Sequence, residues 1–307
     1  MEHQINLTVE ESDTGKRLDT FLAASCMDLS RSYIQKLIKD HRVGINGNFD
    51  VKSKIAVSSS DLITIHLPEP ETLTITPQDI PLDILYEDQD VLVVNKPKGM
   101  VVHPAPGHYS DTLVNAVMFH CKDNLSGING VLRPGIVHRI DKDTTGALIV
   151  CKNDRSHKCI AEQLKAHSIT RTYQAIVYHN FSEESGTIDL PIGRHPTDRK
   201  KRTVTDKNSK RAVTHYTVLD HLDHQFNHIE CRLETGRTHQ IRVHMAHIGH
   251  PLLGDTVYGP SNVKFKTLQG QTLHAGTIGF VHPTTDEYME FEAPLPDYFK
   301  KLLKNLK

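Results

Sequence analysis

The sequence lacks an apolar run long enough to cross a membrane. Its 307 residues contain no stretch of about 18 or more apolar residues, the length that marks a transmembrane helix. The first residues, 1–6, have neither the basic start nor the apolar segment of a secretory signal. The sequence therefore predicts a cytoplasmic protein with no membrane partner.

Cysteine is scarce, and its five residues are scattered without a Cys-x-x-Cys pair. This spacing indicates neither a disulfide framework nor a zinc knuckle. Histidine is abundant, with 21 residues, but the cluster at residues 239–250 lacks the His-Glu-x-x-His arrangement and has no acidic neighbour before Asp255. We therefore expect no bound metal.

Net charge is also small, at −1, which as an average argues against a polyanion-binding protein. The charge is nevertheless unevenly distributed, because residues 69–90 hold seven acids and no Lys or Arg. Residues 194–211 hold eight bases against two acids, a net of +6. The eight bases are Arg194, Arg199, Lys200, Lys201, Arg202, Lys207, Lys210 and Arg211. This segment predicts a loop or hairpin that binds phosphate, with Lys200, Lys201 and Arg202 as RNA contacts, unless it is an ordinary solvated surface.

The most informative segment is Arg133–Gly146, RPGIVHRIDKDTTG, which sets Asp141 among basic neighbours and ends in turn-forming residues. A carboxylate placed there stays ionised near neutral pH and can act as a nucleophile. Two other interpretations remain: a solvated surface turn, and the Asp-x-Asp-x-Thr loop of a Mg²⁺-dependent phosphatase with an aspartate nucleophile. A phosphatase loop normally follows a buried apolar strand, whereas His138 and Arg139 interrupt the apolar residues here.

This segment resembles the catalytic-aspartate motif of the RluA-type pseudouridine synthases, which isomerise uridine in RNA without a cofactor. The resemblance implies that Asp141 attacks a flipped-out nucleotide, at C1′ or at C6. It also implies that Arg139 fills or braces the space that the base vacates, with His138 as a neighbouring RNA contact.

A second block that resembles this family is Leu233–Gly249, LETGRTHQIRVHMAHIG. Thr238 is predicted to cap a helix that Gly249 terminates. The buried stripe of this helix would consist of Ile241, Met245 and Ile248.

The resemblance implies that Arg242, next to this stripe, reaches inward and pairs with Asp141. Arg237 and His239, near the start of the helix, are expected to face RNA phosphate. The alternative is an amphipathic helix whose Arg and His side chains only cover its surface.

Tyr173 lies in a β-rich run, where an aromatic side chain usually packs in the core. It matches the active-site tyrosine of the family, which implies that its ring stacks on the uracil and its hydroxyl assists proton removal from C5. The stretch 95–99 resembles the strand and turn that border the RNA cleft, so Lys96 and Lys98 are expected phosphate contacts. Weaker family-like stretches lie at 102–104, 254–259 and 273–276.

Residues 1–67 predict a small domain with two helices, an Asn-Gly turn after Val43 and a final strand over 62–67. Ser30 is predicted to cap the second helix. This part resembles an S4 RNA-binding domain, and an ordinary solvated α+β cap is the alternative. Its expected RNA contacts are Arg31, Lys36, Lys39 and Arg42.

Residues 68–80 have the Pro-rich, charged composition of a linker. Residues 81–307 predict an α+β catalytic domain, with a large mixed, mostly antiparallel sheet flanked by helices near 112–120 and 156–167. We expect a monomeric RNA pseudouridine synthase that acts on large-subunit ribosomal RNA. A catalytically silent RNA-binding protein would be expected to lack Asp141, Arg242 or Tyr173, and the sequence has all three.

Overall fold

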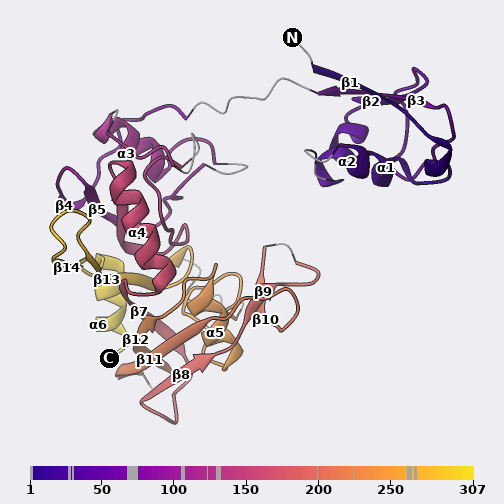
Figure 1. Cartoon of the computed structure of the whole chain (residues 1–307). Helices are drawn as coiled ribbons and strands as arrows, with labels where there is room; N and C mark the ends of the chain where they lie inside the picture. Colours follow the sequence, from indigo (N-terminus) through magenta and orange to yellow (C-terminus); the bar gives the residue numbers. More distant parts are fainter. Residues whose placement is uncertain are drawn as a thin grey trace. The chain divides into compact units, whose positions relative to one another are not determined.

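The chain, seen here in a computed structural model, divides into two compact units, Met1–Leu73 and Thr74–Lys307 (Figure 1). The structure describes residues 3–26, 29, 31–67, 75–104, 108–122, 124–128, 133–198, 200–223, 225–260, 265 and 268–307. Ser30 and its predicted cap, Arg199, and part of the predicted linker lie outside these described residues.

The smaller unit packs two helices against a three-stranded antiparallel sheet of order β1-β3-β2. Its elements are β1 His3–Thr8, a 3-10 turn η1 Glu11–Asp13, α1 Leu18–Ser25, α2 Arg31–Lys39, β2 Val43–Ile45 and β3 Leu62–Leu67. The apolar residues at helical spacing on both helices are buried, as their pattern predicts. Asn46 and Gly47 have φ of 50° and 82°, the left-handed values that a tight Asn-Gly hairpin turn requires.

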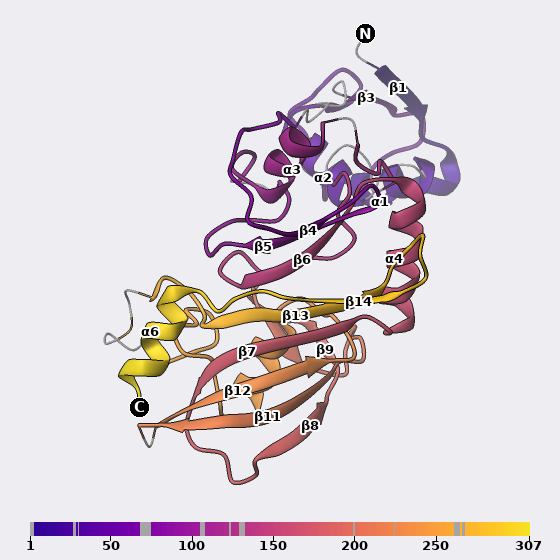
Figure 2. The same ribbon diagram turned by 90° about the vertical axis from the view of Figure 1, so that its left-hand side faces the viewer.

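The larger unit is built on one sheet whose described strands follow the order β4-β5-β6-β13-β7-β12-β11-β8, with β14 beside β13 (Figure 2). These pairs are antiparallel except β13 with β6. The strands are β4 Ile84–Glu87, β5 Val91–Lys96, β6 Thr145–Cys151, β7 Thr170–Tyr178, β8 Ser185–Asp189, β11 Val213–Leu222, β12 Phe226–Leu233, β13 Leu273–Val281 and β14 Tyr288–Glu292. The predicted α+β class with a large, mostly antiparallel mixed sheet is confirmed.

Four helices and a short hairpin complete the described part of the larger unit. The helices are α3 Leu113–Cys121, α4 Asp154–Ala166, α5 Gln240–His247 and α6 Asp297–Asn305, and the hairpin consists of β9 Ile192–Arg194 and β10 Arg202–Val204. Figure 2 shows α4 and α6 near opposite ends of β13. Thr112 with Asn115 and Asn153 with Ser156 form capping boxes that fix where α3 and α4 begin. Among the described residues, no helix is long and apolar enough to cross a membrane.

Two local expectations were wrong. Gly146 does not end a turn but lies in β6, with φ of 111°, and a Cβ there would come 2.1 Å from the carbonyl oxygen of Ala275 on β13. Glycine is needed because the neighbouring parallel strand passes so close. Thr238 does not cap α5: the helix begins at Gln240 after His239, whose φ is 59°. The side chain of Gln240 instead accepts the N–H of Arg237 at 2.9 Å and stabilises the entry to the helix.

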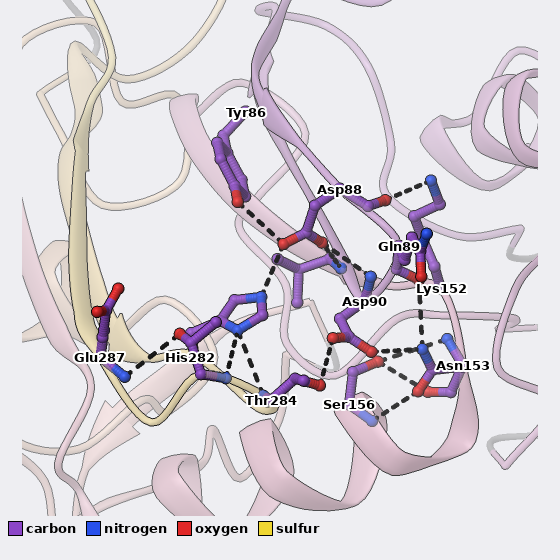
Figure 3. Close-up of polar contacts among 12 residues, drawn as sticks. Tyr86, Asp88, Gln89, Asp90, Lys152, Asn153, Ser156, His282, Thr284 and Glu287 are labelled. Carbon is purple, nitrogen blue, oxygen red and sulfur yellow. Dashed lines mark hydrogen bonds and ion pairs between the residues drawn. The ribbon is translucent and has the colours of Figure 1, made fainter.

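A network of polar contacts joins three loops of the larger unit (Figure 3). Asp88, in the β4–β5 turn, accepts hydrogen bonds from the Tyr86 hydroxyl and from Nε2 of His282, at 2.9 and 2.7 Å. Its neighbour Asp90 bonds to Thr284, in the β13–β14 turn, and to Asn153, at the start of α4. We call Asp88, Asp90, His282 and Thr284 the clasp, because they tie these loops together.

Candidate active site and RNA interface

Asp141 begins a tight turn that leads into β6. The N–H of Thr144 donates to the carbonyl of Asp141 at 3.1 Å and closes the turn. The carbonyl of Lys142 accepts the N–H of Gly99 and the ammonium of Lys96, both at 3.0 Å. The end of β5 therefore holds the loop that carries Asp141.

Lys96 is buried, which does not support its expected contact with phosphate. Its side chain is 1% exposed, and its ammonium also donates to the carbonyls of Pro97 and Met100, at 2.8 Å each. All three donors of the ammonium are therefore used inside the protein. Burial lowers the pKa of Lys96 to about 7, although nearby Asp143 and Asp141 favour the charged form. Lys96 anchors the Asp141 loop and is not a surface cation.

Lys98 is half-buried, and its ammonium donates to the carbonyl of Gly270 at 3.1 Å. It also lies 4.4 Å from the centre of the Tyr298 ring, a cation–π contact. Burial lowers the pKa of Lys98 to about 8. These contacts engage the side chain within the protein, so the structure gives its expected contact with phosphate no support.

Arg242 comes from α5 and connects two carboxylates. Its Nη1 donates to Oδ2 of Asp141 at 2.8 Å, and its Nε and Nη2 donate to the two oxygens of Asp255 at 2.6 and 2.9 Å. The side chains of Arg242 and Asp255 are 6% and 0% exposed, and that of Asp141 is 17% exposed. Burial disfavours the charge, but the two carboxylates raise the pKa of Arg242 above its ordinary value. Arg242 is thus a fixed cation beside Asp141.

Asp255 is in turn held by its own loop. Burial would raise the pKa of Asp255, but Arg242 and the N–H groups of Val257 and Tyr258 hold it below its ordinary value. The ring of Tyr258 lies 5.1 Å from the guanidinium carbon of Arg242.

Tyr173 and Asp141 line the same two adjoining pockets, of about 60 and 340 Å³. Tyr173 lies on β7 and is 8% exposed, so most of its ring is packed in the sheet, as the alternative interpretation holds. Burial raises the pKa of its phenol, which keeps the hydroxyl protonated. Its remaining surface faces the pockets that Asp141 lines.

Arg139 and His138 also border these pockets but differ in exposure and charge. Arg139 is exposed, lines both pockets and bonds His103 at 3.4 Å. His138 lines the larger pocket, and its Nε2 accepts the backbone N–H of Ile149 at 3.0 Å. Burial lowers the pKa of His138 to about 3, so its ring is neutral and offers phosphate no positive charge.

Arg237 and His239 lie on the loop before α5. Arg237 is half-buried, and its Nε donates to the carbonyl of Arg211 at 2.9 Å. His239 lines the pockets themselves, with Nε2 3.8 Å from Oδ1 of Asp141. Its position beside a carboxylate differs from the phosphate-facing position that its place in the helix predicts.

The basic segment forms the β9–β10 hairpin, which borders a groove of about 920 Å³. The basic side chains that line this groove are those of Arg194, Arg202, Lys207, Lys210 and Arg237. Arg237 also lines the pockets of Asp141, so groove and pockets meet at this residue. Lys200 and Lys201 lie in the hairpin outside the lining of the groove. We call the groove lined by these five basic side chains the basic groove.

The comparisons with known proteins agree with this geometry. Residues 90–247 match the family model described as RNA pseudouridylate synthase. An uncharacterized RNA pseudouridine synthase of Bacillus subtilis is 53% identical over 305 residues, which is 99% of each chain. The chain belongs to the RNA pseudouridylate synthase family.

A further relative and a solved structure support the same enzyme class. A ribosomal large subunit pseudouridine synthase D of Zymomonas mobilis is 47% identical and covers 98% of this chain and 96% of its own. The solved structure of human RNA pseudouridylate synthase domain containing 1 has a TM-score of 0.58 at 25% identity, over 78% of this chain and 97% of its own. The predicted enzyme class, an RNA pseudouridine synthase of the RluA type, is confirmed, and RNA is its substrate.

The phosphatase alternative fails for this synthase. Asp141 precedes the buried strand β6, whereas the nucleophile of the phosphatase loop follows such a strand. The family match and the names of the relatives support an enzyme over a chain that only binds RNA.

In the smaller unit, the expected RNA contacts lie on and just after α2. Lys36 and Lys39 are exposed on the face opposite its buried side chains. Arg31 pairs with buried Asp19 at 3.1 Å. Hydrogen bonds to Asp19, of which the bond from Arg17 has the largest effect, hold the pKa of Asp19 well below its usual range. Arg42 is half-buried after the helix.

The sequence interpretation did not assign Asp255 or Tyr258 to the site. Both lie in the family-like stretch 254–259, which was the available signal. Their contact with Arg242 depends on the fold of the loop after α5, and no periodicity in the sequence encodes it.

Proposed function

We propose that this synthase isomerises uridines of large-subunit ribosomal RNA, with Asp141 as the nucleophile. The contact between Asp141 and Arg242 carries the proposal, because it fixes a carboxylate beside a cation in a pocket that Tyr173 also lines, where we place the flipped base. The names of relatives such as the Zymomonas mobilis protein support the ribosomal substrate.

The reaction breaks the N1–C1′ bond of uridine, rotates the uracil and joins C5 to C1′. N1 gains a proton and C5 loses one, so the reaction is an isomerisation. Asp141 would attack C1′ and displace N1, or add to C6 of the uracil, and its bond to that fragment would break by the time C5 is joined to C1′. Arg242 would keep the carboxylate oriented, and Tyr173 would contact the uracil and assist the loss of the C5 proton.

RNA would be held at several places. Arg139, exposed at the rim of the pockets, would occupy the space left by the flipped base. The basic groove, with Lys200 and Lys201 beside it, would bind the phosphate backbone. The smaller unit, as an S4-like domain, would bind RNA through the exposed face of α2. We propose that the enzyme acts as a cytoplasmic monomer.

The test uses unmodified large-subunit ribosomal RNA transcribed in vitro. The native enzyme should form pseudouridine at defined positions, and Asp141→Asn should form none while it still binds the RNA. Asp220→Asn is the matched control, because this carboxylate on β11 pairs with Lys307, lines neither pocket that Asp141 lines, and should leave the reaction intact. Equal modification by the native and Asp141→Asn enzymes would show that Asp141 is not the nucleophile. Modification of other RNAs alone would show that large-subunit ribosomal RNA is not the substrate.

A further inference from the structure

His239 has an unusual backbone for its position. It is the residue immediately before α5, and its φ of 59° places it in the left-handed region, which is uncommon for a residue other than glycine. Such conformations cluster at functional sites. The imidazole lines the pocket of Asp141 and does not line the basic groove.

The contacts of Tyr258 favour one tautomer of His239. The Tyr258 hydroxyl accepts the backbone N–H of Arg202 at 2.8 Å, so its own hydrogen is available to Nδ1 of His239, also at 2.8 Å. Nδ1 is then an acceptor, and in a neutral ring the hydrogen lies on Nε2. Burial lowers the pKa of His239, which agrees with a neutral ring. Nε2 is the nitrogen that faces Oδ1 of Asp141, 3.8 Å away.

We propose that His239 is a positioning residue, which donates through Nε2–H to Oδ1 of Asp141 while Arg242 holds Oδ2. The proposal rests on Asp141 being the nucleophile. With one donor on each oxygen, the carboxylate cannot rotate, and the same lone pair always faces the nucleotide. The distance of 3.8 Å shortens to a hydrogen bond when the nucleotide enters.

The same contacts connect the nucleophile to the basic groove. Arg202 is the first residue of β10, and its backbone fixes the Tyr258 hydroxyl that orients His239. RNA phosphate bound at the hairpin would hold β10 in place and, through Tyr258 and His239, the carboxylate of Asp141. Binding of RNA in the groove would thus favour the aligned nucleophile.

Two substitutions of His239 separate a role of the imidazole from a need for the left-handed backbone. His239→Gly fits this backbone but removes the donor, whereas His239→Gln fits it less well but places an amide N–H near Asp141. With large-subunit ribosomal RNA transcript under single-turnover conditions, we expect the rate constant of His239→Gly to fall about 10–100-fold, the loss seen when an orienting partner is removed. The dissociation constant for the RNA should stay unchanged. His239→Gln, or imidazole added to His239→Gly, should restore part of the rate, and Tyr258→Phe should lower it less.

His179→Gly is the matched control, because His179 is also left-handed, with φ of 66°, but is exposed and lines none of the pockets that Asp141 lines. It should react at the native rate. A His239→Gly enzyme that is as fast as the native one, or faster than His239→Gln, would overturn the proposal. Asp141→Asn in the same assay distinguishes this proposal from the proposed function. If Asp141→Asn still forms pseudouridine, Asp141 is not the nucleophile. If Asp141→Asn is inactive but the His239 variants react at the native rate, His239 has no positioning role.

Discussion

The pocket of Asp141 and the basic groove meet at Arg237, yet they use charge in opposite ways. In the pocket, Arg242 is buried and its donors are shared between Asp141 and Asp255. In the groove, Arg194, Lys207 and Lys210 are exposed, and no ion pair within the described part of the chain engages their side chains. Paired, buried charge fixes geometry, whereas unpaired, exposed charge attracts a polyanion. The comparison predicts that substitutions in the pocket change the rate and those in the groove change the affinity.

The largest effect is expected from Arg242→Gln. It leaves Asp255 buried without its cation, which should cost roughly 3–5 kcal/mol of unfolding free energy. Pseudouridine formation should fall by at least about 10²-fold, the loss typical when one preorganised charge is removed from an active site. Denaturant unfolding and single-turnover assays measure the two effects.

Arg211→Gln is the control for Arg242→Gln. Arg211 donates to both carboxylate oxygens of Asp189, but the side chains are 67% and 48% exposed. An exposed pair contributes only about 0–1 kcal/mol, so stability and rate should stay near native. If both substitutions cost the same, burial does not distinguish the two regions.

The sequence predicted the main partners of the pocket but not how they are held. Asp141, Arg242 and Tyr173 lie in segments with strong family motifs, and the structure brings all three to one pocket. Lys96 was assigned to RNA because the stretch 95–99 resembles the strand and turn that border the RNA cleft in the family. Its burial depends on three carbonyls from two separate segments, which no local pattern reveals.

Helix periodicity was likewise sufficient for the body of α5 but not for its start. Ile241 and Met245 are buried as predicted, whereas Ile248, which ends the predicted stripe, lies just after the helix and is half-buried. Thr238 was a good cap by residue type, but the left-handed His239 intervenes. Tertiary contacts of Gln240 with Val213 and Thr214, and of Tyr258 with His239, decide this local geometry.

An intermediate effect is expected when charge is removed from the basic groove. Replacement of Arg194, Lys207 and Lys210 by Gln should weaken RNA binding and lower the slope of log affinity against log salt by about 2–3, because each phosphate contact contributes about 0.7–0.9. The rate constant at saturating RNA should remain near native. Filter binding at several salt concentrations measures the slope.

The same number of charges removed elsewhere provides the control for the groove. Lys300, Lys301 and Lys304 are exposed on α6, and none lines the groove. Their replacement by Gln should leave the slope within about 1 of the native value, since only charges close to phosphate release counterions. Equal slopes for the two triple variants would contradict a specific phosphate site at the hairpin.

The smallest effect on activity is expected in the clasp, whose charged groups are as densely bonded as those of the pocket but line none of the pockets around Asp141 (Figure 3). Burial raises the pKa of Asp88, but hydrogen bonds from the backbone, Tyr86 and His282 outweigh it and lower the pKa below its ordinary value. A carboxyl whose folded pKa is lowered stabilises the protein above its unfolded pKa, near 4, and loses this contribution as pH falls through the folded value. Asp88→Asn should therefore cost about 1–3 kcal/mol at pH 7 and progressively less in acid, with the rate of pseudouridine formation unchanged. Unfolding curves from pH 7 to pH 3 measure the loss of unfolding free energy. A fall in the rate of pseudouridine formation at pH 7 would mean that a dense polar network supports the reaction even when it lies outside the pocket.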